Sequence, residues 1–214
     1  MSQKSEFFAG EADAWFERNP KTIDCERDPV MRAIRSLGIT PQCVLEIGCG
    51  GGFRLECFRA IYGCECQGID PSRKAVQRVG LQSGITLHQG TADALPGADH
   101  RFDLVMLGFC LYLCDPADYF RIAAEADRVL QSPGFLVISD FLPPVPYRNP
   151  YLDRREIFSR KMEWSRMFLW NPSYRLLSRT YFEQGQQNTF AADESAAVDI
   201  LRKDAALAFP DNPY

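Results

Sequence analysis

Short apolar runs and helix-like stretches alternate through the first two thirds of the chain. Five runs have the length and the apolar, β-rich composition of buried strands, namely residues 43–47, 64–69, 85–89, 102–107 and 135–138. After the first run, Leu55, Phe58 and Tyr62 recur three and four positions apart, which is typical of one face of a helix. Because strands and helices alternate with short connections, the pattern predicts parallel strands in a doubly wound sheet covered on both faces.

Turn residues predict where two further helices begin. Pro71 opens one of them, since proline suits the first helical turn. Asp115 and Pro116 open the other, because an acceptor side chain before proline is typical of a helix N-terminus. Its apolar stripe consists of Tyr119, Ile122, Ala123, Ala126, Val129 and Leu130. Pro133 and Gly134 are expected to end this helix before the fifth strand.

The two ends of the chain have different patterns. Residues 5–37 predict two helices before the first strand, and the first of them carries several aromatic side chains. Residues 142–172 begin PPVPYRNP and then predict an aromatic, basic helix. Residues 174–182 and 196–203 predict two closing strands. We therefore expect a Rossmann-like α/β fold, with a mostly parallel seven-stranded sheet, N-terminal helices and a helical cap inserted after strand five.

The 214 residues are expected to form a single domain, because this length suits one full core plus a cap. Within it we expect four parts. These are an N-terminal helical cover (1–40), a ligand-binding core (42–141), a cap or lid (142–172), and closing strands with a tail (173–214).

Charge and hydropathy narrow the classes of partner. The net charge of −4 argues against nucleic acid, whose phosphates need a basic face. No apolar run reaches the roughly 18 residues that span a membrane. The first fifteen residues lack the basic-then-apolar pattern of a signal peptide. We expect a cytoplasmic protein without a membrane partner, and the sequence gives no oligomeric state.

All eight cysteines lie within the first 114 residues, several of them inside apolar runs. Cys64 and Cys66 have C-x-C spacing, but no second pair and no histidine cluster completes a zinc site. The favoured interpretation is that the cysteines are small buried hydrophobes kept reduced, with no metal site. Metal or redox use remains the alternative.

A glycine-rich exit follows the first strand, in the stretch VLEIGCGGGF. In a doubly wound sheet, ligands bind beyond the carboxyl ends of the strands. Glycine lets the backbone turn sharply and lets a ligand lie against it, and the next helix presents free N–H groups. A dinucleotide fingerprint, G-x-G-x-x-G, fails because Phe53 stands at its third glycine when the match starts at Gly48.

The pattern that is present, E-x-G-x-G-x-G, resembles the first motif of class I S-adenosylmethionine (SAM) dependent methyltransferases. The segments GIDPS, GTADALP, FDLV with GFCLYLCD, and RVL with PGFL resemble further family segments in family order. They lie within residues 42–141, about half of the chain. The N-terminal FFAGEADAWFERN and the cap resemble those of small-molecule methyltransferases in an uncharacterised bacterial subgroup.

The resemblance implies SAM as cofactor and assigns roles to acids at the strand ends. Glu46 would orient the glycine loop or the ammonium group, Asp70 would accept from the ribose hydroxyls, and Asp93 from the adenine amino group. For Asp70 alone, capping of a helix is the alternative. The expected cofactor-binding residues are Trp15, Phe16, Glu46, Gly48, Cys49, Gly50, Gly52, Asp70, Pro71, Ala92, Asp93, Ala94, Gly108 and Phe109.

Methyl transfer from a sulfonium needs aligned reactants, exclusion of water, and a base only if the acceptor carries a proton. Tyr112 and Asp140 are the candidate catalytic residues, because they follow strands four and five. The alternatives are a core position for Tyr112 and a helix-capping or arginine-pairing role for Asp140. The chain lacks the N/D-P-P-Y segment of the family's amino-group methylases, which argues against adenine and glutamine as acceptors.

The acceptor is expected in residues 147–180, which hold eight basic residues against three acids, and seven aromatic residues. Arginine binds carboxylate and phosphate through two parallel hydrogen bonds. We therefore expect this segment to form a lid over an anionic or polar small molecule. An ordinary amphipathic helix with solvated charges is the alternative. The candidate substrate-binding residues are Tyr147, Arg148, Tyr151, Arg154, Arg155 and Phe158.

A SAM-dependent methyltransferase acting on a polar, possibly anionic small molecule is the favoured hypothesis. Three alternatives stay open. The same fold could use SAM for aminopropyl transfer or cyclisation, it could bind SAM without catalysis, or the protein could be a nicotinamide oxidoreductase.

Overall fold

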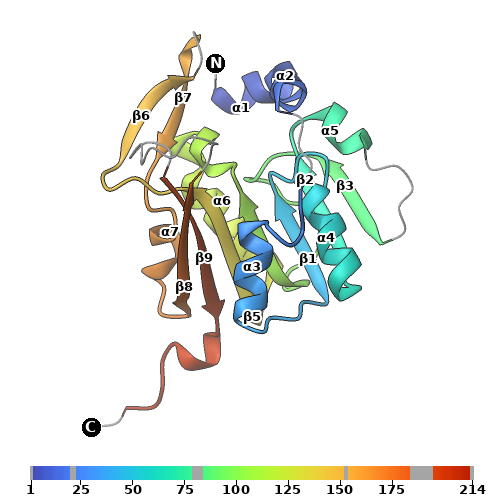
Figure 1. Ribbon diagram of the computed structural model, residues 1–214. Helices are drawn as coiled ribbons and strands as arrows, with labels where there is room; N and C mark the ends of the chain where they lie inside the picture. The colour runs from blue at the N-terminus through green and yellow to red at the C-terminus, as the bar shows by residue number, and fades with distance from the viewer. Residues whose placement is uncertain (1, 20–22, 79–83, 152–153, 184–194, 213–214) are drawn as a thin grey trace.

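A computed structural model describes the chain over residues 2–19, 23–78, 84–151, 154–183 and 195–212. Its centre is a seven-stranded sheet in the order β3-β2-β1-β4-β5-β9-β8 (Figure 1). The strands are β1 Cys43–Ile47, β2 Glu65–Asp70, β3 Ile85–Gln89, β4 Phe102–Gly108, β5 Leu130–Phe141, β8 Tyr174–Glu183 and β9 Ser195–Lys203. Adjacent strands from β3 to β5 are parallel, whereas β9 runs antiparallel to both β5 and β8. The predicted seven-stranded, mostly parallel sheet is confirmed.

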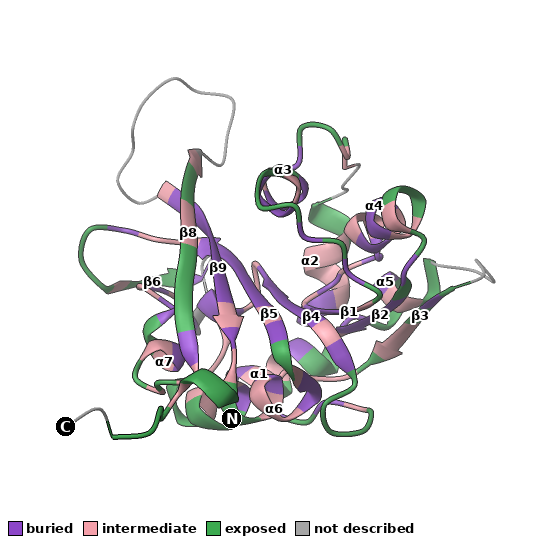
Figure 2. Ribbon diagram, turned by 90° about the horizontal axis from the view of Figure 1, so that it is seen from below, coloured by how far each residue is buried: buried purple, intermediate pink, exposed green. Residues whose placement is uncertain are grey.

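The middle strands are mostly apolar, as expected for a sheet that helices cover on both faces. In β4, residues 104–107 are fully buried. On one face pack α3 (Pro29–Ser36) and α4 (Phe53–Tyr62); on the other pack α6 (Tyr119–Val129) and α7 (Arg166–Leu169). The shorter α5 (Arg73–Arg78) follows β2. Figure 2 shows the central strands buried and much of the edge strand β8 exposed.

Single 3₁₀ turns join or end the regular elements. They are η2 Leu111–Leu113, η3 Pro116–Asp118 and η4 Ala205–Leu207. The helix predicted from Asp115 and Pro116 thus begins with the turn η3 and continues as α6. No helix among the described residues is long and apolar enough to cross a membrane.

The N-terminal segment lies above the carboxyl ends of the parallel strands (Figure 1). It consists of α1 (Gln3–Glu6), the π-helical η1 (Phe7–Glu11) and α2 (Ala12–Arg18). Gly10 interrupts it with a non-helical φ of 152°. At one end the Gln3 side chain donates to the carbonyls of Leu113 (2.6 Å) and Phe158 (2.8 Å). At the other end Asp13 accepts a hydrogen bond from Ser72 (2.6 Å), so the segment bridges the ends of the strands.

The helical cap predicted for residues 142–172 is wrong. The segment contains two antiparallel strands, β6 (Tyr147–Tyr151) and β7 (Arg154–Lys161), and among its described residues only the four-residue α7 is an α-helix. The physical reason is a non-local partner. The backbone of Phe158 pairs with Pro150 across the hairpin and also with the Gln3 side chain, and aromatic residues suit such a pleated surface.

The prediction that the cysteines are all reduced is wrong for one pair. Cys25 and Cys57 form a disulfide, with Cα atoms 5.5 Å apart, and the other six are free thiols. Cys25 precedes α3 and Cys57 lies on α4. Because these two helices pack on the same face of the sheet, residues 32 positions apart meet.

Candidate cofactor cavity and active site

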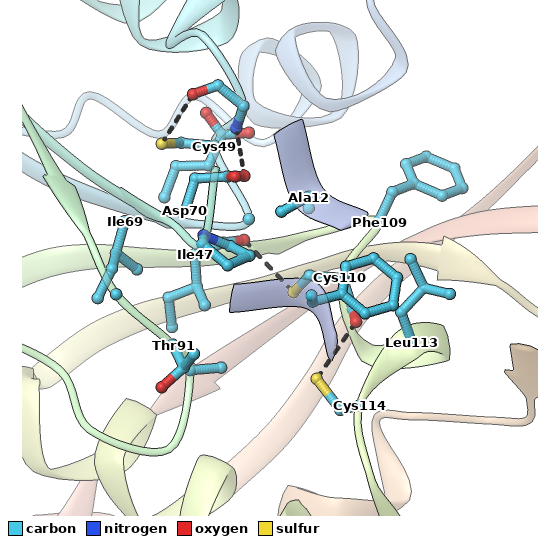
Figure 3. A pocket seen from close by; sticks show the side chains of 18 of the residues that line it. Ala12, Ile47, Cys49, Ile69, Asp70, Thr91, Phe109, Cys110, Leu113 and Cys114 are labelled. Carbon is cyan, nitrogen blue, oxygen red and sulfur yellow. Dashed lines mark hydrogen bonds between the residues drawn. The ribbon is translucent and has the colours of Figure 1, made fainter. Parts of the chain in front are cut away.

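A cavity opens at the carboxyl ends of β1, β2, β3 and β4 and is covered by the N-terminal segment (Figure 3). Its floor includes the glycine loop from Gly48 to Gly51. Carboxylates of Glu46, Asp70 and Asp93 reach it from three successive strand ends. The cavity therefore lies where ligands bind in open α/β sheets.

Two glycines of the loop are needed for different reasons. Gly48 has a φ of +75°, and a Cβ there would lie 2.5 Å from the Cβ of Cys110. Gly50 has a φ of +52°, but a Cβ there would meet nothing within 4 Å. The backbone at Gly48 thus packs against the neighbouring strand end, while Gly50 faces open space in which a ligand can approach the backbone.

A buried ion network supports the loop from below. Glu46 is 2% exposed and forms an ion pair with Arg54, in the first turn of α4. The Arg54 guanidinium also pairs with Asp28, the N-cap of α3 (3.2 Å). Burial lowers the pKa of Arg54, but the two carboxylates outweigh it and raise that pKa overall, so the side chain stays charged. Arg54 and Asp28 were not among the predicted site residues, although Arg54 lies only two positions after Gly52.

Asp70 ties two loops together at the end of β2. Its carboxylate accepts a hydrogen bond from the Gly50 amide (2.8 Å; Figure 3) and another from the Ser72 amide (2.9 Å). Asp70 also lines the cavity with Pro71. Asp70 thus caps the turn before α5 and also faces the cavity.

At the far end of the cavity, an ion pair closes the site. Asp93 is 8% exposed and accepts a hydrogen bond from Lys4 Nζ (2.6 Å), which also lies 3.5 Å from Asp118. Burial raises the pKa of Asp93, but the hydrogen bonds from Lys4 and Thr91 and the charge of Lys4 together outweigh burial and lower that pKa overall. Asp93 is thus an ionised acceptor, and the covering segment itself supplies its cation.

The turn after β4 carries two aromatic side chains, Phe109 and Tyr112, and only Phe109 lines the cavity. Phe109 has a φ of +48°, which is uncommon for a residue with a bulky side chain, and it lines the cavity. Tyr112 is 9% exposed and packs edge-on against Phe141, with ring centroids 5.1 Å apart. Burial and the charge of Asp140 raise the pKa of Tyr112, and a hydrogen bond from Trp15 lowers it less, so the phenol stays protonated.

Asp140 stabilises this turn. It is 2% exposed, and its two oxygens accept from the amides of Leu111 (3.1 Å) and Phe141 (2.7 Å). Burial raises its pKa to about 7, while those amides and the charge of Lys161 oppose the rise. Asp140 is not among the residues that line the cavity. Its contacts with backbone amides are those of a capping carboxylate, which was the alternative to a catalytic role for Asp140.

The other predicted residues divide between the cavity and the hairpin. Of the remaining predicted cofactor-binding residues, five line the cavity, namely Trp15, Phe16, Cys49, Ala92 and Gly108. Gly52 and Ala94 do not line it. Gly52 is the N-cap of α4.

Of the candidate substrate-binding residues whose side chains the structure describes, none lines the cavity. Arg148 stacks on Phe158, with its Cζ 4.7 Å from the ring centroid, and Tyr151 donates to Glu11 (3.2 Å). Tyr147 lies on β6. Arg154 and Arg155 belong to β7, and their side chains lie outside the described part of the structure.

The cysteines of the cavity are not activated. Burial raises the pKa of the thiols of Cys49 and Cys110 well above the usual range, and that of Cys114 to about 12. Such thiols are weak nucleophiles at neutral pH. Over the described ranges, no group of three histidine, cysteine or acidic side chains could hold a metal ion.

Comparison with known proteins identifies the fold and the motifs. Residues 45–138 match the model of a methyltransferase domain, which spans β1 to β5 and the loops that build the cavity. Residues 45–138 thus carry a methyltransferase domain, and this match supports the class I SAM-dependent methyltransferase family. An uncharacterised methyltransferase, sll0829, of Synechocystis sp. is 34% identical over 113 residues, 52% of this chain and 53% of that protein.

Other similar proteins are also named as methyltransferases. The uncharacterised methyltransferase YcgJ of Bacillus subtilis is 30% identical over 144 residues, 58% of this chain and 54% of its own. The chain thus spans about half the length of these curated relatives. The solved 1,6-didemethyltoxoflavin-N1-methyltransferase of Burkholderia thailandensis superposes with a TM-score of 0.70, over 94% of this chain and 87% of its own. At 20% identity, that likeness concerns the fold alone.

Proposed function

We propose that this protein binds SAM in the cavity and transfers its methyl group to a polar, possibly anionic small molecule. The observation that carries the proposal is the joint position of the glycine loop and the three carboxylates, which meet at one cavity although they come from separate strands. The charged lining residues are Lys4, Arg54, Glu46, Asp70, Asp93, Asp115 and Asp118. Acids outnumber bases, which favours a ligand that carries a sulfonium and an ammonium group.

Each part of the cavity suits one part of SAM, following the roles that the family resemblance implies. The loop from Gly48 to Gly50 would lie along the amino-acid part, because Gly50 leaves the backbone accessible. Asp70 would accept from the ribose hydroxyls and Asp93 from the adenine amino group. The sulfonium methyl is the electrophile that the cofactor supplies. The N-terminal segment and Phe109 would exclude water from the transfer.

A small-molecule acceptor is supported by the names of relatives. The Burkholderia enzyme was solved with 1,6-didemethyltoxoflavin and S-adenosylhomocysteine (SAH) bound. A ubiquinone biosynthesis O-methyltransferase of Cereibacter sphaeroides is 35% identical over 113 residues, 50% of this chain and 42% of its own. Both names describe action on small organic molecules.

Product analysis tests the proposal. The protein is incubated with SAM and pooled small-molecule acceptors, and the nucleoside product is identified by mass spectrometry. SAH supports methyl transfer, whereas methylthioadenosine indicates aminopropyl chemistry. Calorimetry with SAM, SAH and NAD(P) gives the control: tight binding of NAD(P) with none of SAM or SAH overturns the proposal. Binding of SAM without turnover of any acceptor would favour a non-catalytic SAM binder.

The N-terminal segment is expected to respond to the cofactor. Lys4 donates to Asp93, the carboxylate that we assign to the adenine amino group, and the N-terminal segment covers the cavity. Ligand entry therefore requires this segment to move. We predict that SAH slows backbone hydrogen exchange in residues 5–19, measured by mass spectrometry, and leaves α3 unchanged. Equal protection of residues 5–19 with and without SAH would make the segment a fixed packing element. Trp15 and Phe16 would then be core residues.

A further inference from the structure

The end of the cavity that we assign to adenine holds a cation of the chain itself. The Lys4 ammonium donates to Asp93 (2.6 Å) and lies 3.5 Å from Asp118, and all three residues line the cavity. The hydrogen bond to Asp93 raises the pKa of Lys4, so the side chain is an ammonium at neutral pH. A positive charge from the N-terminal segment thus lies between two carboxylates of the cavity wall.

Contacts other than this ammonium fix α1 above the strand ends. The Gln3 side chain donates to the carbonyls of Leu113 and Phe158, and the backbone amide of Lys4 donates to Asp115 (3.2 Å). These contacts remain whichever way the Lys4 side chain points. That side chain is 36% exposed, so its ammonium can turn out into water while α1 stays in place.

A ligand that uses Asp93 has to take the place of the ammonium. The adenine amino group is a neutral donor, whereas the Lys4 ammonium makes a charge-assisted hydrogen bond, which is roughly twice as strong as a neutral one. At this carboxylate, cofactor binding therefore exchanges a stronger bond for a weaker one. The exchange lowers the affinity for the cofactor below what the same cavity would give without the ammonium.

We propose that Lys4 is an autoinhibitory residue, whose ammonium competes with the cofactor for the Asp93 carboxylate. This inference rests on the proposed function, because it needs SAM as the ligand and Asp93 as the acceptor for adenine. Cofactor binding expels the ammonium into water, while Gln3 keeps α1 over the strand ends. A change that removes the charge of Lys4 therefore raises the affinity for the cofactor.

Lys4→Met tests the proposal, because it keeps most of the length of the side chain and removes its charge. We expect calorimetry to show that SAH binds this variant about tenfold more tightly than the wild type, since a charge-assisted contact that opposed binding is gone. Lys4→Arg keeps a cation and should bind SAH much as the wild type does. Unchanged or weaker SAH binding by Lys4→Met overturns the proposal.

Lys74→Met is the matched control. Lys74 forms an ion pair with Glu17 on α2, so it also fastens the N-terminal segment, but it does not line the cavity. Its replacement should not raise the SAH affinity. A rise of the same size in Lys4→Met and Lys74→Met would mean that a looser segment is the cause, which overturns the proposal. In an Asp93→Asn background, Lys4→Met should lose most of its effect, because the two residues act on each other.

Amine labelling of the wild type gives a test that needs no variant. Acetic anhydride acetylates accessible amines, and mass spectrometry of the peptides measures Lys4 and Lys74 separately. Saturating SAH should raise the acetylation rate of Lys4 severalfold, because release from Asp93 lowers the pKa of the amine and exposes it to water. The rate at Lys74 should stay unchanged. An unchanged or slower rate at Lys4 overturns the proposal.

SAH binding by the wild type separates the two proposals. Failure of the wild type to bind SAH or SAM overturns the proposed function, and this inference with it. If the wild type binds SAH but Lys4→Met does not bind it more tightly, this inference alone is overturned.

Discussion

Replacing Asp70 with alanine is expected to weaken SAH binding at least about tenfold, because hydrogen bonds to a charged group contribute about 1.5–3 kcal/mol. Two losses add up. The ligand loses a carboxylate at the end of β2, and the Gly50 amide, which Asp70 holds at 2.8 Å, is released from its position in the glycine loop. Calorimetric titration with SAH measures the change.

Asp211→Ala is the matched control, since it removes an exposed carboxylate from the C-terminal tail. Asp70→Asn separates the two losses: it keeps the size and one carbonyl oxygen, so it should hold the loop better than alanine does. Urea unfolding reports the stability of each variant. An unchanged dissociation constant in a folded Asp70→Ala protein would remove Asp70 from the binding site.

Replacing Arg54 with leucine should lower the free energy of unfolding by about 3–5 kcal/mol, the usual cost of leaving a buried charge without its partner. The guanidinium is the shared partner of Glu46 and Asp28, which are 2% and 8% exposed. Without it, two buried carboxylates lie close to each other and beneath the glycine loop. Urea unfolding followed by circular dichroism measures the change.

Two variants test whether uncompensated charge is the cause. Arg73→Leu, on the exposed face of α5, should change the stability by less than about 0.5 kcal/mol. In the Arg54→Leu background, Glu46→Gln removes one of the two unpaired charges and should restore part of the lost stability. A loss below about 1 kcal/mol in Arg54→Leu, or no recovery in the double variant, would show that the network is not a stabilising element.

The sheet and the position of the cavity could be predicted because both follow from local signals. The predicted strands at residues 43–47 and 85–89 have the same bounds as β1 and β3, since short apolar runs between turn residues are buried strands. The alternation of strands and helices then required parallel pairing, and parallel pairing brings the carboxyl ends of the strands to one edge. Glu46, Asp70 and Asp93 meet there although they are more than twenty positions apart in sequence.

The remaining features depend on contacts between distant positions, which no local pattern encodes. Residues 147–161 form a hairpin because Pro150 pairs with Phe158 and Gln3 binds the Phe158 backbone. Asp140 was a candidate base by its place in the sequence, but one of its oxygens accepts from the Leu111 amide in the turn after β4 and the other from the amide of the next residue, Phe141.

The same reason explains the ion pairs and the disulfide. Lys4 reaches Asp93 only because the N-terminal segment folds back over the strand ends, and Cys25 reaches Cys57 only because α3 and α4 share one face of the sheet. The sequence by itself determined the sheet, the glycine loop and the acids around it, because these depend on hydrophobic period and turn chemistry. Only the tertiary structure decided which side chains cover and support them, because those partners meet through packing and not through spacing along the chain.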